Sequence, residues 1–322
     1  MSTETIMAPA PLVRRALNGP AMGARWSAVF HAGPDPNEAA LAARLQEAVE
    51  AVEQEMSPWR PDSDVERFNR APVGTWVRLP PNLFAVIAAA LEIADRSGGA
   101  LDVGVGDLVK AWGLGAGSRT PNPGAIAALA GKSFGPAPRA LHLDCAGRRA
   151  RRLAPLRVDL SAVAKGFGVD ELTRVMTEAG VASFLVGVDG EMRAGGVKPD
   201  GRPWAVGHER PDREARALIG VLELSDCAVA TSGNYRHVAT VAGRTVSHTI
   251  DPHRRAPLDN DLASVTVLAP TAMAADGWAT ALMVLGRDRG AALARELGLR
   301  AVFVTSDGEV AETKGPLDRG AR

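Results

Sequence analysis

The residues best suited to chemistry lie near the C-terminal end of this 322-residue chain. Asp276 and Thr280 stand four positions apart within the apolar run 275–282, so a helix places both on one face. Carboxylate and hydroxyl oxygens are ligands that a hard cation prefers. Because an unpaired buried carboxylate is costly, this pair indicates a metal site. A helix with one buried hydrogen bond is the simpler alternative.

Two further polar segments lie in the same part of the chain, Thr231-Ser232-Gly233-Asn234-Tyr235-Arg236 and Ser247-His248-Thr249-Ile250-Asp251-Pro252. Histidine has an unperturbed pKa suited to a base near neutral pH, which makes His248 a candidate catalytic residue. Asp251 and Asp159 compete for the same role. A histidine in a strand pattern is also commonly a satisfied core or surface residue.

A third segment, Asp159-Leu160-Ser161-Ala162-Val163-Ala164-Lys165-Gly166, is predicted to end a strand and open a helix. The free amides of a helix N-terminus receive phosphate oxygens well, and Lys165 adds a mobile positive charge there. Taken alone, Asp159 also suits a helix cap or a turn, and Lys165 a solvated side chain. The argument for a site therefore depends on all three segments together.

The periodicity of apolar residues supplies the elements that must position these segments. Helices are predicted over 37–55, 82–97, 124–130, 166–179, 272–285 and 288–297, with a short helix before Asn69 and the first residue of 82–97 as its cap. Strands are predicted over 24–31, 182–188, 191–196, 203–209, 217–224, 227–231, 236–242, 244–250, 262–268 and 300–305, with two more within 140–158. The order of these elements indicates one α+β unit, with mostly antiparallel sheets flanked by helices.

Composition narrows the function further. The 37 basic and 37 acidic residues cancel, so no charge footprint favours nucleic acid. The arginine-rich run 148–152 fits a solvated turn between two strands.

The cysteines and the chain ends bear on where the protein works. Cys145 and Cys227 are expected to be buried free thiols. No apolar run of 18 residues predicts a membrane span, and residues 1–19 are expected to form a flexible tail. As written the chain lacks a signal peptide or lipid-attachment cysteine, which favours the cytoplasm; a truncated start would allow the periplasm.

Several motifs in order give the chain a strong resemblance to the ApbE family of FAD:protein FMN transferases. The motifs that carry this resemblance are spread over nearly the whole chain. In chain order they are Met22-Gly23, Met56-Ser57-Pro58-Trp59, Gly99-Ala100-Leu101-Asp102, Ala111-Trp112-Gly113, Asp159 to Gly166, Pro203-Trp204-Ala205-Val206-Gly207, Ala230-Thr231-Ser232-Gly233-Asn234-Tyr235, Ser247 to Pro252, and Ala275-Asp276 with Thr280-Ala281. The resemblance implies a single T-fold-like domain over 20–314, followed by a short tail at 315–322.

The resemblance also implies a reaction and a set of residues. FAD is the substrate, Mg²⁺ is the cofactor, and FMN is transferred to a Thr or Ser hydroxyl of a redox protein with an Asp-Gly-x-x-Thr-like motif, with AMP released. The implied metal ligands are the carbonyl of Ala162 and the side chains of Asp276 and Thr280. The residues implied to contact FAD are Met22, Trp59, Ala100, Leu101, Asp102, Lys165 and Ile250, while His248 and Asp159 would act on the acceptor hydroxyl. An FAD pyrophosphatase, with water as acceptor, and a non-catalytic FAD-binding protein remain as alternatives.

Four positions depart from the family pattern. They are Ala24 after Met-Gly, Val103-Gly104 after Asp102, the turn Val188-Asp189-Gly190-Glu191, and His253-Arg254-Arg255-Ala256 after Asp-Pro. All are expected beside the nucleotide cleft, so they bear on FAD affinity and acceptor choice. The expected metal ligands are intact, which favours an active enzyme.

Overall fold

The computed structural model describes residues 11–34, 37–117, 120–130, 136–211, 217–234, 238–241 and 244–315. Within these ranges, the main sheet has eight strands in the order β1-β2-β6-β7-β10-β15-β16-β17, and every neighbouring pair is antiparallel. Its strands are β1 (Val13–Ala21), β2 (Ala24–Ala32), β6 (Ser183–Val188), β7 (Glu191–Gly195), β10 (Ala228–Gly233), β15 (Leu262–Ala269), β16 (Arg300–Thr305) and β17 (Val310–Thr313).

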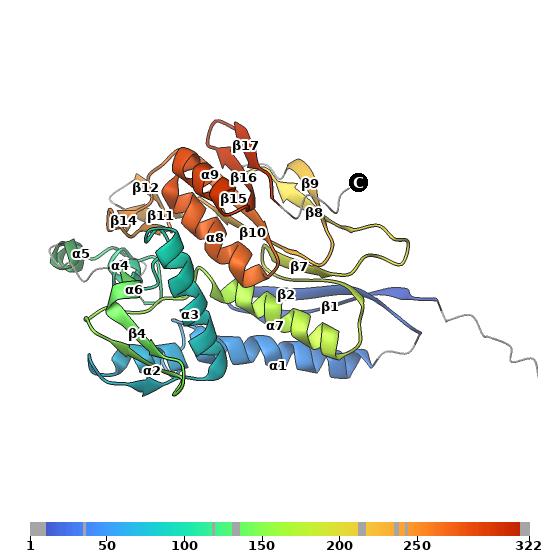
Figure 1. Cartoon of the computed structure of the whole chain (residues 1–322), viewed down its shortest axis with the longest axis horizontal. Coiled ribbons are helices and arrows are strands. Elements are labelled where there is room, and N and C mark those ends of the chain that lie inside the picture. The colour runs from blue at the N-terminus through green and yellow to red at the C-terminus, as the bar shows by residue number, and fades with distance from the viewer. Residues whose placement is uncertain are drawn as a thin grey trace, which may run out of the picture.

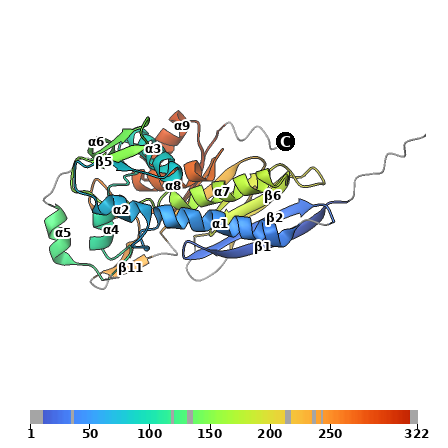
Figure 2. The ribbon, with the colours of Figure 1, turned by 90° about the horizontal axis from the view of Figure 1, so that it is seen from below.

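One face of this sheet is covered by α1 (Glu38–Met56), α7 (Ala164–Glu178), α8 (Ala272–Leu285) and α9 (Arg287–Glu296), as Figures 1 and 2 show from two sides. In α1, Leu41, Leu45 and Val49 recur at helical spacing and are buried. They share a core with Trp26 and Phe30 of β2 and with the apolar side of α7. The predicted α+β architecture is confirmed.

The other face of the sheet is covered by a hairpin of β8 (Trp204–Glu209) and β9 (Leu218–Leu224). Trp204 and Leu224 from this hairpin pack against Val229 of β10 and Leu268 of β15. The central strands are therefore buried on both faces, which explains why β15 reads as an almost continuous apolar run.

A smaller lobe lies at one end of the main sheet (Figure 1). It consists of α2 (Asp64–Arg70), β3 (Val77–Arg78), α3 (Pro81–Arg96), α4 (Gly106–Ala111), α5 (Pro123–Ala130), α6 (Ala137–Ala140), β4 (Leu141–Asp144) and β5 (Arg149–Arg152). Its core is continuous with α8, β15 and β16, so the lobe belongs to the same domain. Two short pairs, β11 (Val238–Val241) with β12 (Arg244–Ser247) and β13 (Ile250–Asp251) with β14 (Ala256–Pro257), complete the described elements.

The N-terminal boundary differs from the prediction. Residues 13–19, expected in a flexible tail, form most of β1 and pair with β2 along its full length. The strand was missed because Gly19 and Pro20 are typical of turns, but an edge strand tolerates proline. The rest of the two predicted tails, residues 1–10 and 316–322, lies outside the described residues.

Two local predictions were also wrong. The side chain of Asn82 does not cap α3; Glu55 of α1 accepts from the Leu83 amide at 2.8 Å and from the Asn82 side chain at 3.3 Å. Of the two free cysteines, Cys227 is buried as expected, but Cys145 is exposed because it lies in the turn between β4 and β5. No helix in the described ranges is both long and apolar enough to span a membrane.

Candidate functional site

A cavity of about 300 Å³ opens where α7 and α8 meet the strands β7 and β10. Ten of the twelve predicted site residues meet there from distant parts of the chain. The predicted residues in its lining are Ala100, Leu101, Asp102, Asp159, Ala162, Lys165, His248, Ile250, Asp276 and Thr280. The fold therefore brings together nearly the whole predicted site.

Asp276 lies at the floor of the cavity with only 5% of its surface exposed. Its Oδ2 accepts a hydrogen bond from the amide of Gly166 at 3.0 Å. Burial, and then the nearby charge of Glu191, raise the pKa of the Asp276 carboxyl well above its usual range. A carboxylate in such a place is stabilised by a bound cation.

Gly166 lies in the first turn of α7, where backbone amides have no carbonyl partner within the helix. The Gly166 amide is satisfied by Asp276 instead, which ties the start of α7 to α8. Ala162, just before α7, lines the cavity beside this contact. The expectation that the Gly166 amide receives phosphate is correspondingly wrong, since Asp276 already occupies it.

The donor set at the floor fits a hard cation. Thr280, one turn after Asp276 on α8, lines the cavity and shares a hydrogen bond of 3.0 Å with Ser232 of β10. A carboxylate, a hydroxyl and a carbonyl are the oxygen ligands that Mg²⁺ prefers, with waters or phosphate oxygens completing its shell. In the described ranges no three His, Cys, Asp or Glu side chains cluster as a metal site, so these mixed oxygens would have to suffice.

Lys165 lies between two acids at the same floor. Its Nζ is 2.8 Å from Glu191 Oε1 and 3.8 Å from Asp189 Oδ2. Burial alone would lower the pKa of Lys165, but Glu191 and Asp276 together raise it above its usual value. The second oxygen of Glu191, Oε2, is buried and has no hydrogen-bond partner among the described residues.

On the β8 side of the cavity, three buried or half-buried side chains form a row of hydrogen bonds. His208 of β8 is 7% exposed, and its Nε2 is 2.9 Å from the hydroxyl of Thr266. Thr266 in turn lies 2.8 Å from the hydroxyl of Thr231, which lines the cavity. Burial lowers the pKa of His208, which keeps the imidazole uncharged near neutral pH.

The candidate catalytic residues lie nearer the opening. His248 is exposed and occupies a bend between β12 and β13, not the continuous strand 244–250 that the sequence predicts. Asp159 is half-buried, and its Oδ1 accepts from the amide of Ser161 at 2.8 Å. Both side chains line the cavity, with the buried Ile250 beside them.

The Gly-rich segment before α4 contributes an apolar wall. Ala100 and Leu101 are buried and line the cavity. Asp102 reaches it too, but its carboxylate accepts from the amides of Gly104 at 2.7 Å and Ala137 at 3.2 Å. Its contribution is therefore to hold this loop in shape. Burial raises the pKa of Asp102, and these two amides oppose the shift.

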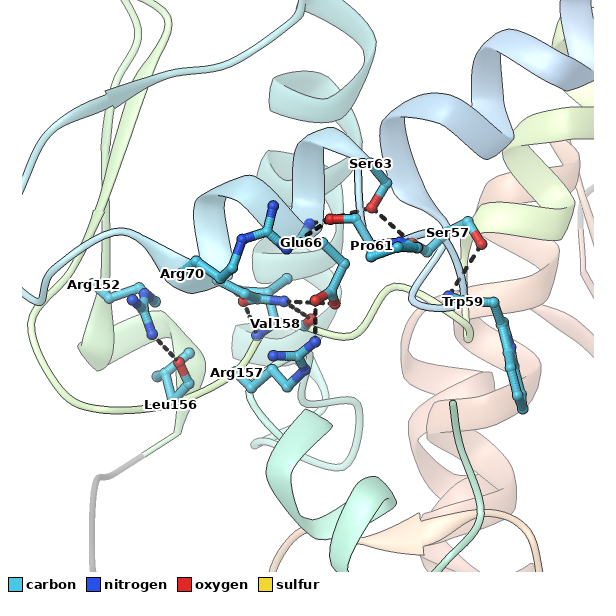
Figure 3. Close-up of polar contacts among 11 residues, drawn as sticks. Ser57, Trp59, Pro61, Ser63, Glu66, Arg70, Arg152, Leu156, Arg157 and Val158 are labelled. Carbon is cyan, nitrogen blue, oxygen red and sulfur yellow. Dashed lines mark hydrogen bonds and ion pairs between the residues drawn. The ribbon is translucent and has the colours of Figure 1, made fainter. Parts of the chain in front are cut away.

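Two residues expected to contact FAD are not in the lining of this cavity. Trp59 is 57% exposed, and Figure 3 shows its side chain turned away from the neighbouring polar cluster. Met22 has φ of 50°, donates its amide to Glu53, and packs between the two main core clusters. Neither position could be settled from the sequence, since loop direction depends on tertiary contacts.

The polar segment 57–69 has a clear scaffolding role (Figure 3). Asn69 of α2 accepts from the amide of Val158 and donates to its carbonyl, both at 2.8 Å. Glu66 pairs with Arg157, and the buried Ser63 caps α2. These contacts fix the segment that leads directly to Asp159 and Ala162. Within the described range 136–211, the strand predicted to end there is absent: the segment forms only an isolated bridge between Arg157 and Val105.

Sequence reasoning missed two buried cavity residues, Glu191 and His208. The turn that contains Glu191 was noted only as a departure from the family pattern. A carboxylate at the first position of a predicted strand, between two sheet-forming runs, is a detectable signal, because buried acids need partners. His208 had no such signal, because its hydrogen-bond partner Thr266 comes from β15, far along the chain.

Comparison with known proteins gives a consistent result. A family model described as "ApbE family" matches residues 22–303. The chain is 33% identical over 301 residues to the FAD:protein FMN transferase of Klebsiella pneumoniae strain 342, covering 91% of this chain and 85% of that protein. It is 34% identical over 303 residues to the transferase of the same name from Salmonella typhimurium strain LT2, with the same shares covered.

Solved structures agree. The structure of the flavin transferase ApbE from Vibrio cholerae superposes with a TM-score of 0.85 at 31% identity, covering 96% of this chain and 99% of that one. The apo form of the flavinyl transferase ApbE from Pseudomonas stutzeri gives a TM-score of 0.83 at 33% identity, with 98% of each chain covered.

Proposed function

The chain belongs to the ApbE family, and on this premise we propose that it transfers the FMN moiety of FAD to a hydroxyl group of an acceptor protein. A bond forms between the acceptor oxygen and the phosphorus of the FMN moiety. The bond from that phosphorus to the bridging pyrophosphate oxygen breaks, and this oxygen leaves with AMP. The hydroxyl proton passes to a base on the enzyme.

The observation that carries this proposal is the buried Asp276 beside Thr280 and the Ala162 carbonyl at the cavity floor. Phosphoryl transfer needs positioning and charge neutralisation more than covalent chemistry from the protein. These three groups would hold Mg²⁺, which when bound neutralises negative charge on the pyrophosphate oxygens. Lys165 supplies a second, fixed positive charge at the same floor.

The residues at the opening are assigned to the acceptor. His248 is exposed at the cavity, so it can meet a hydroxyl that arrives from outside and accept its proton. Asp159, whose carboxylate is fixed by the Ser161 amide, orients the same hydroxyl. Ala100, Leu101 and Ile250 offer apolar contact to the rings of FAD.

The acceptor is proposed to be a redox protein with a threonine in an Asp-Gly-x-x-Thr-like motif, as the family resemblance implies. Both the enzyme's similarity to named FMN transferases and the open position of His248 support a macromolecular acceptor.

The test is an analysis of products. The purified chain is incubated with FAD and a protein that carries an Asp-Gly-x-x-Thr segment, with Mg²⁺ or with EDTA, and intact masses are measured. We expect the acceptor to gain one FMN only with Mg²⁺. Free FMN and AMP without a labelled acceptor would instead identify a pyrophosphatase, and unchanged FAD would identify a binding protein.

A further inference from the structure

A second cavity of about 960 Å³ adjoins the first. Three segments of the chain line both cavities, and each crosses from one to the other between successive residues, at 209–210, 233–234 and 247–248. The two cavities therefore lie next to each other along three segments of the chain. The first, inner cavity contains the proposed metal ligands, and the second, outer cavity extends to Val310 of β17.

The outer cavity has exposed apolar sides. Leu218 of β9 is 63% exposed and Val310 of β17 is 51% exposed, and both line the second cavity. In the described part of the chain, β17 pairs only with β16 and β9 only with β8. Each strand therefore presents an outer edge, and exposed strand edges accept an extended polypeptide.

The charges in the outer cavity do not suit FAD. Asp259 and Asp307 line the second cavity, with Arg210 as the one basic residue in its described lining. An anionic pyrophosphate would be repelled by the net negative charge there, whereas an uncharged apolar stretch of polypeptide would not. The inner cavity, with Lys165 and the proposed cation ligands, is the part suited to phosphate.

We propose that the outer cavity binds the acceptor protein, as an extended segment beside the hydroxyl that is modified. This inference rests on the proposed function, because only a polypeptide acceptor needs to continue beyond the reacting hydroxyl. Apolar side chains of the segment contact Leu218 and Val310, and its hydroxyl residue reaches His248. The segment runs past Ser247 and Asn234, which are joined by a hydrogen bond at the boundary between the two cavities.

The test compares Val310→Glu and Leu218→Glu with a matched control, Val221→Glu. Val221 is 60% exposed on the same hairpin as Leu218 but is absent from the lining of both cavities. The probe is a purified protein with an Asp-Gly-x-x-Thr segment, present with FAD and Mg²⁺, and labelling rates are measured over a range of acceptor concentrations. We expect KM for the acceptor to rise about tenfold in both test variants, with kcat and the Kd for FAD unchanged. The control should match the parent.

Other outcomes are distinguishable. Equal acceptor KM values in all four proteins would overturn the proposal while leaving the transferase intact. A weaker affinity for FAD with unchanged acceptor KM would assign the outer cavity to FAD. A change in sedimentation coefficient alone would assign it to self-association. A parent protein that labels no acceptor would overturn the proposed function itself, and the docking proposal with it. Circular dichroism of each variant checks that the fold is retained.

Discussion

The floor of the inner cavity and its wall on the β8 side both bury polar groups, but in different ways. The floor gathers charges, with Lys165 between Glu191 and a deeply buried Asp276. The wall gathers neutral groups in a hydrogen-bonded row, His208 to Thr266 to Thr231. The polar groups of the wall are hydrogen-bonded to one another, whereas the floor has more acidic than basic side chains. The floor is therefore the part that gains most from a bound cation.

Energetics support the same contrast. Glu191 Oε2 is buried without a partner among the described residues, and the pKa of Asp276 is raised by burial and by Glu191. Burying unpaired carboxylates costs free energy, which a cation at the floor would offset. Substitutions at the floor should therefore alter catalysis and stability together, while those at the wall should have small effects.

The largest expected effect comes from Asp276→Asn. This variant keeps the size of the side chain and removes its charge, so the rate of FMN transfer should fall by about a thousandfold or more. Because a costly buried charge is lost, the unfolding temperature without metal should equal or exceed that of the parent. Asp288→Asn, the same change on the exposed start of α9, is the control. Transfer at the parent rate would remove Asp276 from the metal site.

His248→Ala should have the next largest effect. Loss of a general base costs about a hundredfold in rate or more, and the Kd for FAD should change little because the side chain is exposed at the opening. His142→Ala, at an exposed position on β4, makes the same change elsewhere. Steady-state labelling rates and FAD fluorescence titration separate the two quantities. An unchanged labelling rate would exclude His248 from proton transfer.

Lys165→Met tests the pairing at the floor. Removing this cation leaves Glu191 and Asp276 without their nearest positive charge, and breaking a buried pair is strongly destabilising. Since the Lys165 side chain is 33% exposed, we expect a smaller loss of about 2 kcal/mol in urea unfolding. Adding Glu191→Gln should recover part of that loss. If the two changes alter the free energy of unfolding additively, Lys165 and Glu191 do not interact.

The smallest effect is expected at the wall. Burial lowers the pKa of His208 in the folded protein below its pKa in the unfolded chain. At a pH between these two pKa values, His208 takes up a proton when the protein unfolds. The free energy of unfolding should therefore be greatest above about pH 6.5 and fall as the pH drops below it. His208→Gln, which keeps a donor for Thr266, should flatten this dependence. The free energy of unfolding in urea is measured for the parent and for His208→Gln at about pH 7.5 and about pH 5.5. An equal change between the two pH values in both proteins would contradict the prediction.

Local periodicity predicted much of the fold. The helix 272–285 is reproduced to the residue, and the strand 300–305 likewise, because an apolar pattern and clear turn residues bound each of them. The failures have a common cause. Residues 13–19 form a strand because β2 pairs with them, and α3 is capped by Glu55 from another helix. Such partners are remote in sequence, so a local pattern does not reveal them.

The site was predictable to a similar extent. Residue types at helical spacing placed Asp276 and Thr280 together, and side-chain chemistry singled out Lys165 and His248. The family resemblance added Ala162, and all five residues line one cavity. The resemblance did not separate residues that face the cavity from those that hold it in shape. Asp102 is committed largely to backbone amides, and the segment before Asn69 anchors Val158. Side-chain direction of this kind is set by tertiary contacts.

The most direct test of the contrast between floor and opening is metal-dependent stability. Thermal unfolding of the parent, Asp276→Asn and His248→Ala would be followed as Mg²⁺ is titrated in the presence of FAD. A ligand that binds only the folded state raises the unfolding temperature with its concentration. We expect Mg²⁺ to stabilise the parent and His248→Ala alike and to leave Asp276→Asn unchanged. Equal stabilisation of all three proteins would contradict the assignment of the cation to the floor.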